Sequence, residues 1–155
     1  MSQFPLLFTS GEVQRLVGVS QRQLTYWDQS ALISPHGRDS AGRGSHRLYT
    51  VVDVVCLKTI RRLRESGISL QKIRSAMKFL SDLPDEPVPL AELEVVTDGN
   101  TILVVRSDAS LVEVPTGQMV LRLPLSTLLS EVQQSIGVDL LAGSTASAPA
   151  TLRTN

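Results

Sequence analysis

The chain has 155 residues, 42% of them hydrophobic, with 15 basic and 15 acidic residues. This length fits one domain or two small ones, and the hydrophobic content excludes a wholly disordered chain. A single cysteine excludes an internal disulfide, and the apolar runs are far shorter than the roughly 20 residues of a membrane span.

The overall neutrality conceals an uneven distribution of charge. Residues 1–80 contain 12 Lys and Arg against 5 Asp and Glu, a net charge of +7. Residues 81–155 contain 3 against 10, a net charge of −7. This asymmetry is typical of a nucleic-acid-binding module joined to a different kind of domain.

The first elements are two short helices separated by a turn. Ser10 is a good N-cap and predicts a helix over 11–16, while Gly18 permits the tight turn that follows. Ser20 is the expected N-cap of a second helix, Gln21–Gln29. Its inward residues are expected to be Leu24 and Trp27. This arrangement is a helix-turn-helix.

A polar, basic loop follows the second helix. Leu32-Ile33 and Arg47-Leu48-Tyr49 are predicted to be two short strands, because both are apolar and β-prone. The segment between them, Ser34–His46, is rich in Gly, Ser and Arg. We interpret it as a β-hairpin wing.

Two longer amphipathic helices come next. Thr50 and Asp53 open a helix that runs to about Ser66, with Gly67 as its C-terminal stop. Its buried residues are expected to be Val54, Leu57, Ile60 and Leu63. Ser69 caps a fourth helix whose apolar positions are Leu70, Ile73, Met77 and Leu80.

Three prolines and several acids then interrupt the helical pattern and indicate a domain boundary. We predict an α+β chain with domains at 1–82 and 91–141, a linker at 83–90 and a disordered tail at 142–155. The second domain is a short antiparallel sheet and one helix, Leu125–Ile136, which buries Leu128, Leu129, Val132 and Ile136. Its strands are expected at Leu93–Thr97, Ile102–Arg106, Leu111–Val114 and Met119–Leu123.

The first half of the chain resembles the MerR family of winged-helix transcription regulators. The resemblance begins at Phe8-Thr9-Ser10-Gly11-Glu12-Val13 and continues through Gly18-Val19-Ser20 and Arg22–Asp28. It resumes at Ala31–Pro35, Ser45–Tyr49, Asp53 and Leu63–Leu70. It implies a winged helix-turn-helix, a sequence-specific DNA site and a homodimer on an inverted repeat.

Several positions depart from the family pattern. Tyr26-Trp27 stands where two tyrosines are usual, Thr25 stands where Arg is usual, and Pro84 leaves no room for the family's long dimerising helix. The cysteine pair of the metal-sensing members is absent. The Tyr-Trp pair, a long wing and a strand-rich second domain resemble an actinobacterial-type subgroup that includes cell-division regulators.

The resemblance points to candidate DNA contacts in two places. On the second helix, Arg can pair with guanine, Gln with adenine, and Tyr with phosphate or a thymine methyl. In the wing, basic residues can hold phosphate or enter the minor groove, although Arg38 is as consistent with a flexible charged loop. The candidate set is Thr9, Arg22, Gln23, Thr25, Tyr26, Arg43, His46 and Arg47.

Other conspicuous residues have simpler explanations. Trp27 and Cys56 are expected in the core, and Tyr49 is as consistent with packing as with DNA binding. Lys58, Arg61 and Arg62 either reach flanking phosphate or form a solvated helix face, with Arg61–Glu65 as an i,i+4 pair. We find no catalytic constellation and no metal spacing, so we expect neither an enzyme nor a cofactor.

The sequence therefore predicts a cytoplasmic, nucleoid-associated transcription regulator that binds double-stranded DNA as a homodimer. RNA polymerase is a further candidate partner, no membrane partner is expected, and no residue suggests a small-molecule effector. The alternative is a DNA-bound protein-interaction adaptor, such as a cell-division factor, that acts through the acidic C-terminal domain.

Overall fold

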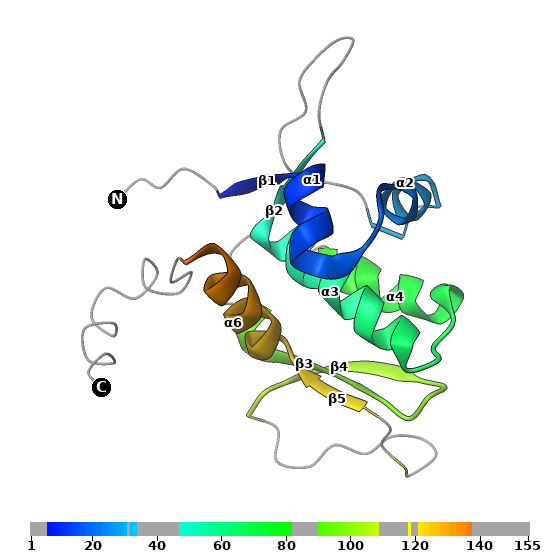
Figure 1. Ribbon diagram of the computed structural model, residues 1–155. Helices are drawn as coiled ribbons and strands as arrows, with labels where there is room; N and C mark the ends of the chain where they lie inside the picture. Colours follow the sequence, from blue (N-terminus) through cyan, green and yellow to red (C-terminus); the bar gives the residue numbers. More distant parts are fainter. Residues whose placement is uncertain are drawn as a thin grey trace, which may run out of the picture.

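In the computed structural model (Figure 1) the described residues are 6–30, 32–33, 47–81, 90–108, 118 and 121–137. The side chains of residues 79 and 81 are outside this description. Also outside it are the predicted wing at 34–46, residues 83–89 of the predicted linker, the strand at 111–114 and the tail at 142–155. The α+β class is confirmed, with a helix-turn-helix followed by a strand-rich part.

The helix-turn-helix begins with α1 (Ser10–Val13), which runs directly into the π-helical turn η1 (Gln14–Gly18). The N-cap is Thr9 and not Ser10, so that prediction is wrong by one residue. Glu12 N donates to Thr9 Oγ1 at 3.2 Å, and Thr9 N donates to Glu12 Oε1 at 2.8 Å. This reciprocal pairing requires a Thr and a Glu three residues apart, a spacing that Thr9 satisfies.

Helix α2 (Gln21–Gln29) has the predicted bounds and the predicted cap, Ser20. Gly18 has φ +83°, which confirms the left-handed turn that separates α2 from η1. Leu24 and Trp27 are buried, as expected.

The strand predicted at Leu32-Ile33 is not present. The Leu32 and Ile33 amides both donate to Trp27 O, at 2.9 and 3.3 Å, and so close the end of α2 instead of joining a ladder. Strand β2 (Leu48–Thr50) pairs antiparallel with β1 (Leu7–Thr9), which the sequence analysis missed. In that register Phe8 lies opposite Tyr49, and both side chains are buried.

Helix α3 (Val51–Glu65) begins with a capping box formed by Thr50 and Asp53. Gly67, at φ +89°, ends it as predicted. Helix α4 (Leu70–Ser81) follows, and Lys72 N donates to Ser69 Oγ at 3.3 Å, which supports Ser69 as its cap. The predicted inward residues of both helices are buried except Leu70, which is half-buried.

The C-terminal part is an antiparallel sheet in the order β4-β3-β5 with one helix, α6 (Leu125–Ile136). Strands β3 (Leu93–Thr97) and β4 (Ile102–Arg106) and helix α6 have the predicted bounds. Strand β5 covers Leu121–Pro124 and overlaps the strand predicted at Met119–Leu123, whose first two residues lie outside the described residues. Helix α6 buries Leu128, Leu129 and Val132 as predicted, while Ile136 is half-buried.

Helices α3, α4 and α6 lie between the helix-turn-helix and the three-stranded sheet (Figure 1). The buried apolar residues of α3 and α6 belong to one hydrophobic cluster, which also contains Trp27 and Val95. Cys56 lies inside this cluster as a buried thiol, as expected of a small core residue.

All three cations of α3 that the sequence analysis assigned either to phosphate contact or to a solvated face have a protein partner. Lys58 Nζ and Arg62 Nη2 donate to the two carboxylate oxygens of Glu131 in α6, at 2.9 and 2.7 Å. Arg61 forms the predicted pair with Glu65, with Nε 2.9 Å from Oε2.

Candidate nucleic-acid interface

Helix α2 presents a polar outer face along its whole length. The apolar side chains of Leu24 and Trp27 face the core, and this fixes the rotation of the helix about its axis. Arg22, Gln23 and Tyr26 are consequently exposed, and Tyr26 retains 54% of its free surface. An exposed tyrosine between polar neighbours suits contact with a polar partner that also has apolar edges.

Hydrogen bonds order the start of this face. Ser20 N donates to Gln23 Oε1 at 3.0 Å, and Gln23 N donates to Ser20 Oγ at 3.1 Å. The amide oxygen of Gln23 therefore serves the helix cap, and a base contact by Gln23 must use its amide nitrogen or replace this bond. Thr25 is half-buried, and its Oγ1 accepts from Gln21 Nε2 at 3.2 Å.

Gln21 links the two helices of the motif, a role that the sequence analysis missed. Its Oε1 accepts from Ser10 Oγ and from Gln14 Nε2, each at 3.0 Å. The donors come from α1 and η1, so one amide oxygen joins both to the first turn of α2. The only sequence signal was a polar residue next to an N-cap, which is too common to be specific.

Thr9 lies one helix away from this face and has a structural role. Its hydroxyl and its backbone amide are both engaged with Glu12 in the capping box of α1. The side chain is exposed, so a DNA contact by Thr9 stays a prediction alongside its role as a cap.

Arg47 follows the segment 34–46, where the wing was predicted, and lies immediately before β2. Its guanidinium forms an ion pair with Asp28 of α2, and half of the Arg47 side chain remains exposed. This pair ties Arg47, next to the start of β2, to α2. Arg43 and His46, the other two wing residues of the candidate set, lie in the part of the chain that is not described.

Tyr49 is buried beneath this corner, which supports packing as its role. Burial raises the pKa of the Tyr49 phenol, an effect that the charge of Arg47 partly offsets and that of Asp53 reinforces. The phenol is therefore neutral at physiological pH and does not act as an anion at the interface.

A groove of about 540 Å³ runs beside the outer face of α2. Two arginines that the candidate set did not include, Arg61 and Arg64, contribute to its wall. The lining residues are Gly18, Gln23, Tyr26, Trp27, Arg61, Arg64, Glu65 and Leu70. The structure thus brings Gln23 and Tyr26 together with cations from α3, which suits an anionic, partly aromatic partner.

Other kinds of site find little support in the described part of the chain. Within it, no group of three or more His, Cys, Asp or Glu side chains could hold a metal ion. No helix among the described residues has the length and apolar character needed to cross a bilayer.

Comparison with known proteins assigns the helix-turn-helix. The sequence model described as "MerR HTH family regulatory protein" matches residues 8–80. An uncharacterized HTH-type transcriptional regulator of Mycobacterium tuberculosis is 36% identical over 103 residues, which are 66% of this chain and 45% of that protein. That alignment is longer than the family match, so part of the likeness lies outside residues 8–80.

Two further relatives match a shorter stretch. The HTH-type transcriptional regulator HmrR of Sinorhizobium medicae is 36% identical over 72 residues, 46% of this chain and 47% of HmrR. The nodulation protein NolA of Bradyrhizobium elkanii is 36% identical over 75 residues, 48% of this chain and 33% of NolA. The chain thus covers half or less of the length of these relatives. Residues 8–80 therefore form a domain of the MerR family of helix-turn-helix regulatory proteins.

Proposed function

We propose that this chain is a sequence-specific DNA-binding transcription regulator. The observation that carries the proposal is the exposed polar face of α2, with Arg22, Gln23 and Tyr26 outward on a helix whose rotation is fixed by Leu24 and Trp27. A recognition helix needs this division, because its outer side chains enter the major groove while its inner ones hold the fold. The family membership and the regulators among the relatives support it.

In this proposal α2 contacts the base edges in the major groove, and the wing contacts the phosphates of the DNA backbone. Arg22 is the candidate for guanine, because its side chain is exposed near the start of the helix. Thr25 and Tyr26 extend the reading face, while Arg43, His46 and Arg47 follow the phosphates. One helix reads only a few base pairs, so a homodimer on an inverted repeat gives the required specificity.

The proposed partners are double-stranded DNA, a second copy of the chain and RNA polymerase. A nucleoid-associated location in the cytoplasm follows from the DNA partner. Family and relatives indicate a regulator in place of an enzyme, and we propose no cofactor.

The test is selection of genomic fragments at physiological salt, followed by titration of the enriched duplex with variants. We expect Arg22→Ala to weaken binding by about 10-fold or more at the preferred sequence, because a bidentate base contact contributes about 1–3 kcal/mol. Arg106→Ala is the matched control, since Arg106 is an exposed arginine on β4. Equal binding by the wild-type protein and Arg22→Ala would show that Arg22 makes no base contact.

Arg47 requires a second comparison, because it pairs with Asp28. Arg47→Ala should reduce the salt dependence of binding by about one ion if Arg47 holds a phosphate. Asp28→Asn removes the ion pair but keeps the arginine, so it separates the two roles. Sedimentation of the protein–DNA complex gives the number of chains per duplex and tests the homodimer directly.

The acidic C-terminal part favours one alternative, an adaptor that acts through protein contacts. Residues 81–155 carry a net charge of −7, which suits a basic protein partner better than DNA. Because this adaptor is DNA-bound, failure of the wild-type chain to enrich any duplex would overturn the regulator and the adaptor alike.

A further inference from the structure

Two arginines from outside the helix-turn-helix bind backbone carbonyls on either side of α2. Arg61 of α3 donates from Nη1 to Val17 O at 2.6 Å. Arg74 of α4 donates from Nη2 to Ser30 O at 3.0 Å. Each bond joins residues 44 positions apart in the sequence, so both are tertiary contacts.

Both carbonyls lie at helix ends. Val17 is in the last turn of η1, just before the turn into α2, and Ser30 is the C-cap of α2. The last carbonyls of a helix have no partner within it and carry partial negative charge. A guanidinium satisfies such a carbonyl with a charge-assisted hydrogen bond, which is stronger than a neutral one.

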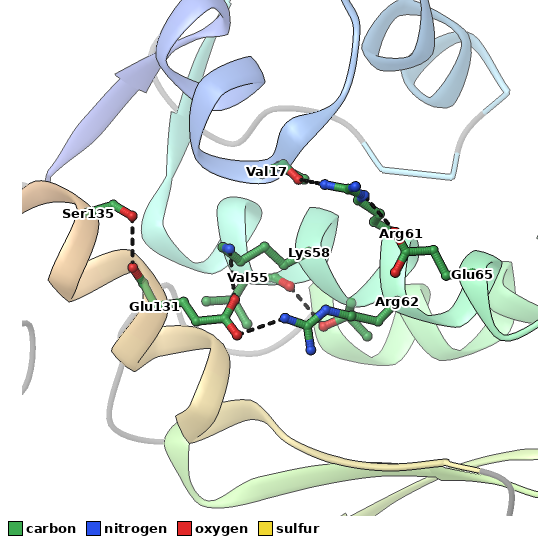
Figure 2. Close-up of polar contacts among 9 residues, drawn as sticks. Val17, Val55, Lys58, Arg61, Arg62, Glu65, Glu131 and Ser135 are labelled. Atoms are coloured by element: carbon green, nitrogen blue, oxygen red, sulfur yellow. Dashed lines mark hydrogen bonds and ion pairs between the residues drawn. The ribbon is translucent and has the colours of Figure 1, made fainter.

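Gly18 leaves space for the hydrogen bond from Arg61 to Val17 O, because it has no side chain. A Cβ at Gly18 would collide with Arg61 Nη1, and the φ of +83° already disfavours any other residue there. A second hydrogen bond also orients the Arg61 side chain, since its Nε donates to Glu65 Oε2 at 2.9 Å. Figure 2 shows the Arg61 side chain extending from α3 toward Val17, whereas Lys58 and Arg62 extend toward Glu131 of α6.

We propose that Arg61 and Arg74 are positioning residues that set the placement of α2 on α3 and α4. The inference rests on the proposed function, in which α2 reads DNA. Arg61 lines the groove beside α2 and could instead be a phosphate ligand. Its Nη1 and Nε already donate to protein acceptors, which favours the positioning role.

If so, the ability of α2 to discriminate between DNA sequences depends on Arg61 and Arg74, although neither residue contacts a base. Recognition by α2 requires its side chains to be placed to within fractions of an ångström, whereas phosphate contacts tolerate small shifts. Loss of either bond frees one end of α2. Specific binding should therefore weaken while non-specific binding persists.

The test compares Arg61→Met and Arg74→Met with the wild-type full-length chain. Methionine keeps an apolar stem and removes the donors. Arg61→Lys and Arg74→Lys restore charge and one donor, and Arg106→Met is the control for loss of an exposed charge on β4. Should a methionine variant unfold by circular dichroism, the corresponding Arg→Leu variant, which also lacks a donor, replaces it in every comparison.

Two readouts separate this inference from the proposed function. The first needs no DNA: Trp27 is the chain's single tryptophan and lies buried in α2, so acrylamide quenching of its fluorescence reports the seating of that helix. The second is affinity, as a function of salt, for the duplex enriched by the wild-type protein from a random library and for an unrelated duplex. A wild-type chain that enriches no duplex would overturn the proposed function and leave the Trp27 readout to test the seating of α2.

We expect each methionine variant to bind the enriched duplex about 10-fold more weakly, the equivalent of one charge-assisted hydrogen bond. Affinity for the unrelated duplex should stay within about twofold, the salt slope should be unchanged, and quenching of Trp27 should increase. The lysine variants should recover most of the specific affinity. A salt slope lower by about one, with equal loss on both duplexes, would make the residue a phosphate ligand and overturn its positioning role; unchanged quenching with unchanged affinity would overturn it as well.

Discussion

Glu131 of α6 accepts a 2.9 Å hydrogen bond from Lys58 of α3, a contact between residues 73 positions apart. Arg62, one turn further along α3, donates to the second oxygen of the same carboxylate at 2.7 Å. One acid of the acidic half therefore pairs with two cations of the basic half (Figure 2). The contact attaches α6 to the helix that also carries Arg61.

Replacement of Glu131 by Gln should lower the free energy of unfolding at pH 7 by about 1 kcal/mol. Glutamine keeps the shape but removes the charge that compensates Lys58, whose side chain is only 13% exposed. Urea unfolding measures the difference. Glu92→Gln is the control, because Glu92 is exposed and lies 3.8 Å from Arg106. Equal losses in the two variants would show that the buried contact contributes no more than a surface pair.

The same carboxylate should give stability a specific pH dependence. Burial alone raises the pKa of Glu131, but hydrogen bonds and charges from Lys58 and Arg62 outweigh it and hold the pKa below its ordinary value. A depressed pKa stabilises the fold above the unfolded value of about 4.3, and this contribution is lost as the pH falls through the folded pKa. Unfolding experiments across that acid range should show this loss in the wild type and its absence in Glu131→Gln.

Local signals in the sequence predicted much of this fold. Ser20 before an amphipathic stretch located α2, and Thr50 with Asp53 located the start of α3. Gly18 and Gly67 marked two turns because both adopt positive φ. These features were predictable because each depends on residues within one or two helical turns.

Contacts between distant residues were not predictable in the same way. The pairing of β1 with β2 places Phe8 opposite Tyr49, and no residue pattern within either segment indicates which segment it pairs with. The sequence around Arg62 could not distinguish between exposure to solvent, contact with phosphate and a hydrogen bond to Glu131. The candidate site was thus predicted as a set of residue types on α2. The hydrogen bonds from Arg61 of α3 and Arg74 of α4 could be identified only in the structure.

Gly18→Ala should destabilise the protein more than Gly67→Ala. Both positions have positive φ, so alanine costs about 1 kcal/mol of backbone strain at either one. A Cβ at Gly67 meets nothing within 4 Å, whereas one at Gly18 displaces the guanidinium of Arg61. Thermal unfolding of the two variants isolates that extra cost. It should disappear in the Gly18→Ala, Arg61→Met double variant when compared with Arg61→Met alone, and persistence there would assign the cost to the backbone only.

The two acid-based capping boxes should differ in strength because they differ in burial. Asp53, 1% exposed, bonds Thr50 N at 2.9 Å inside the core, and Asp53→Ala should cost about 2 kcal/mol. Glu12 bonds Thr9 N at 2.8 Å at the surface, and Glu12→Ala should cost about 0.5 kcal/mol. Urea unfolding of both variants gives the comparison. Similar losses would mean that burial adds nothing to the value of the cap.

Leu128→Ala should destabilise the helix-turn-helix as well as the C-terminal part. Leu128 of α6 is fully buried in the cluster that contains Leu57 and Trp27, so the cavity should cost about 2–5 kcal/mol for that shared core. Trp27 fluorescence reports unfolding near α2, and far-UV circular dichroism reports all helices. Because one core joins the two parts, both signals should shift together to lower urea concentration and remain coincident. A Trp27 transition that stayed at its wild-type midpoint while the dichroism signal moved would show that residues 1–82 unfold independently, as expected of a separate domain.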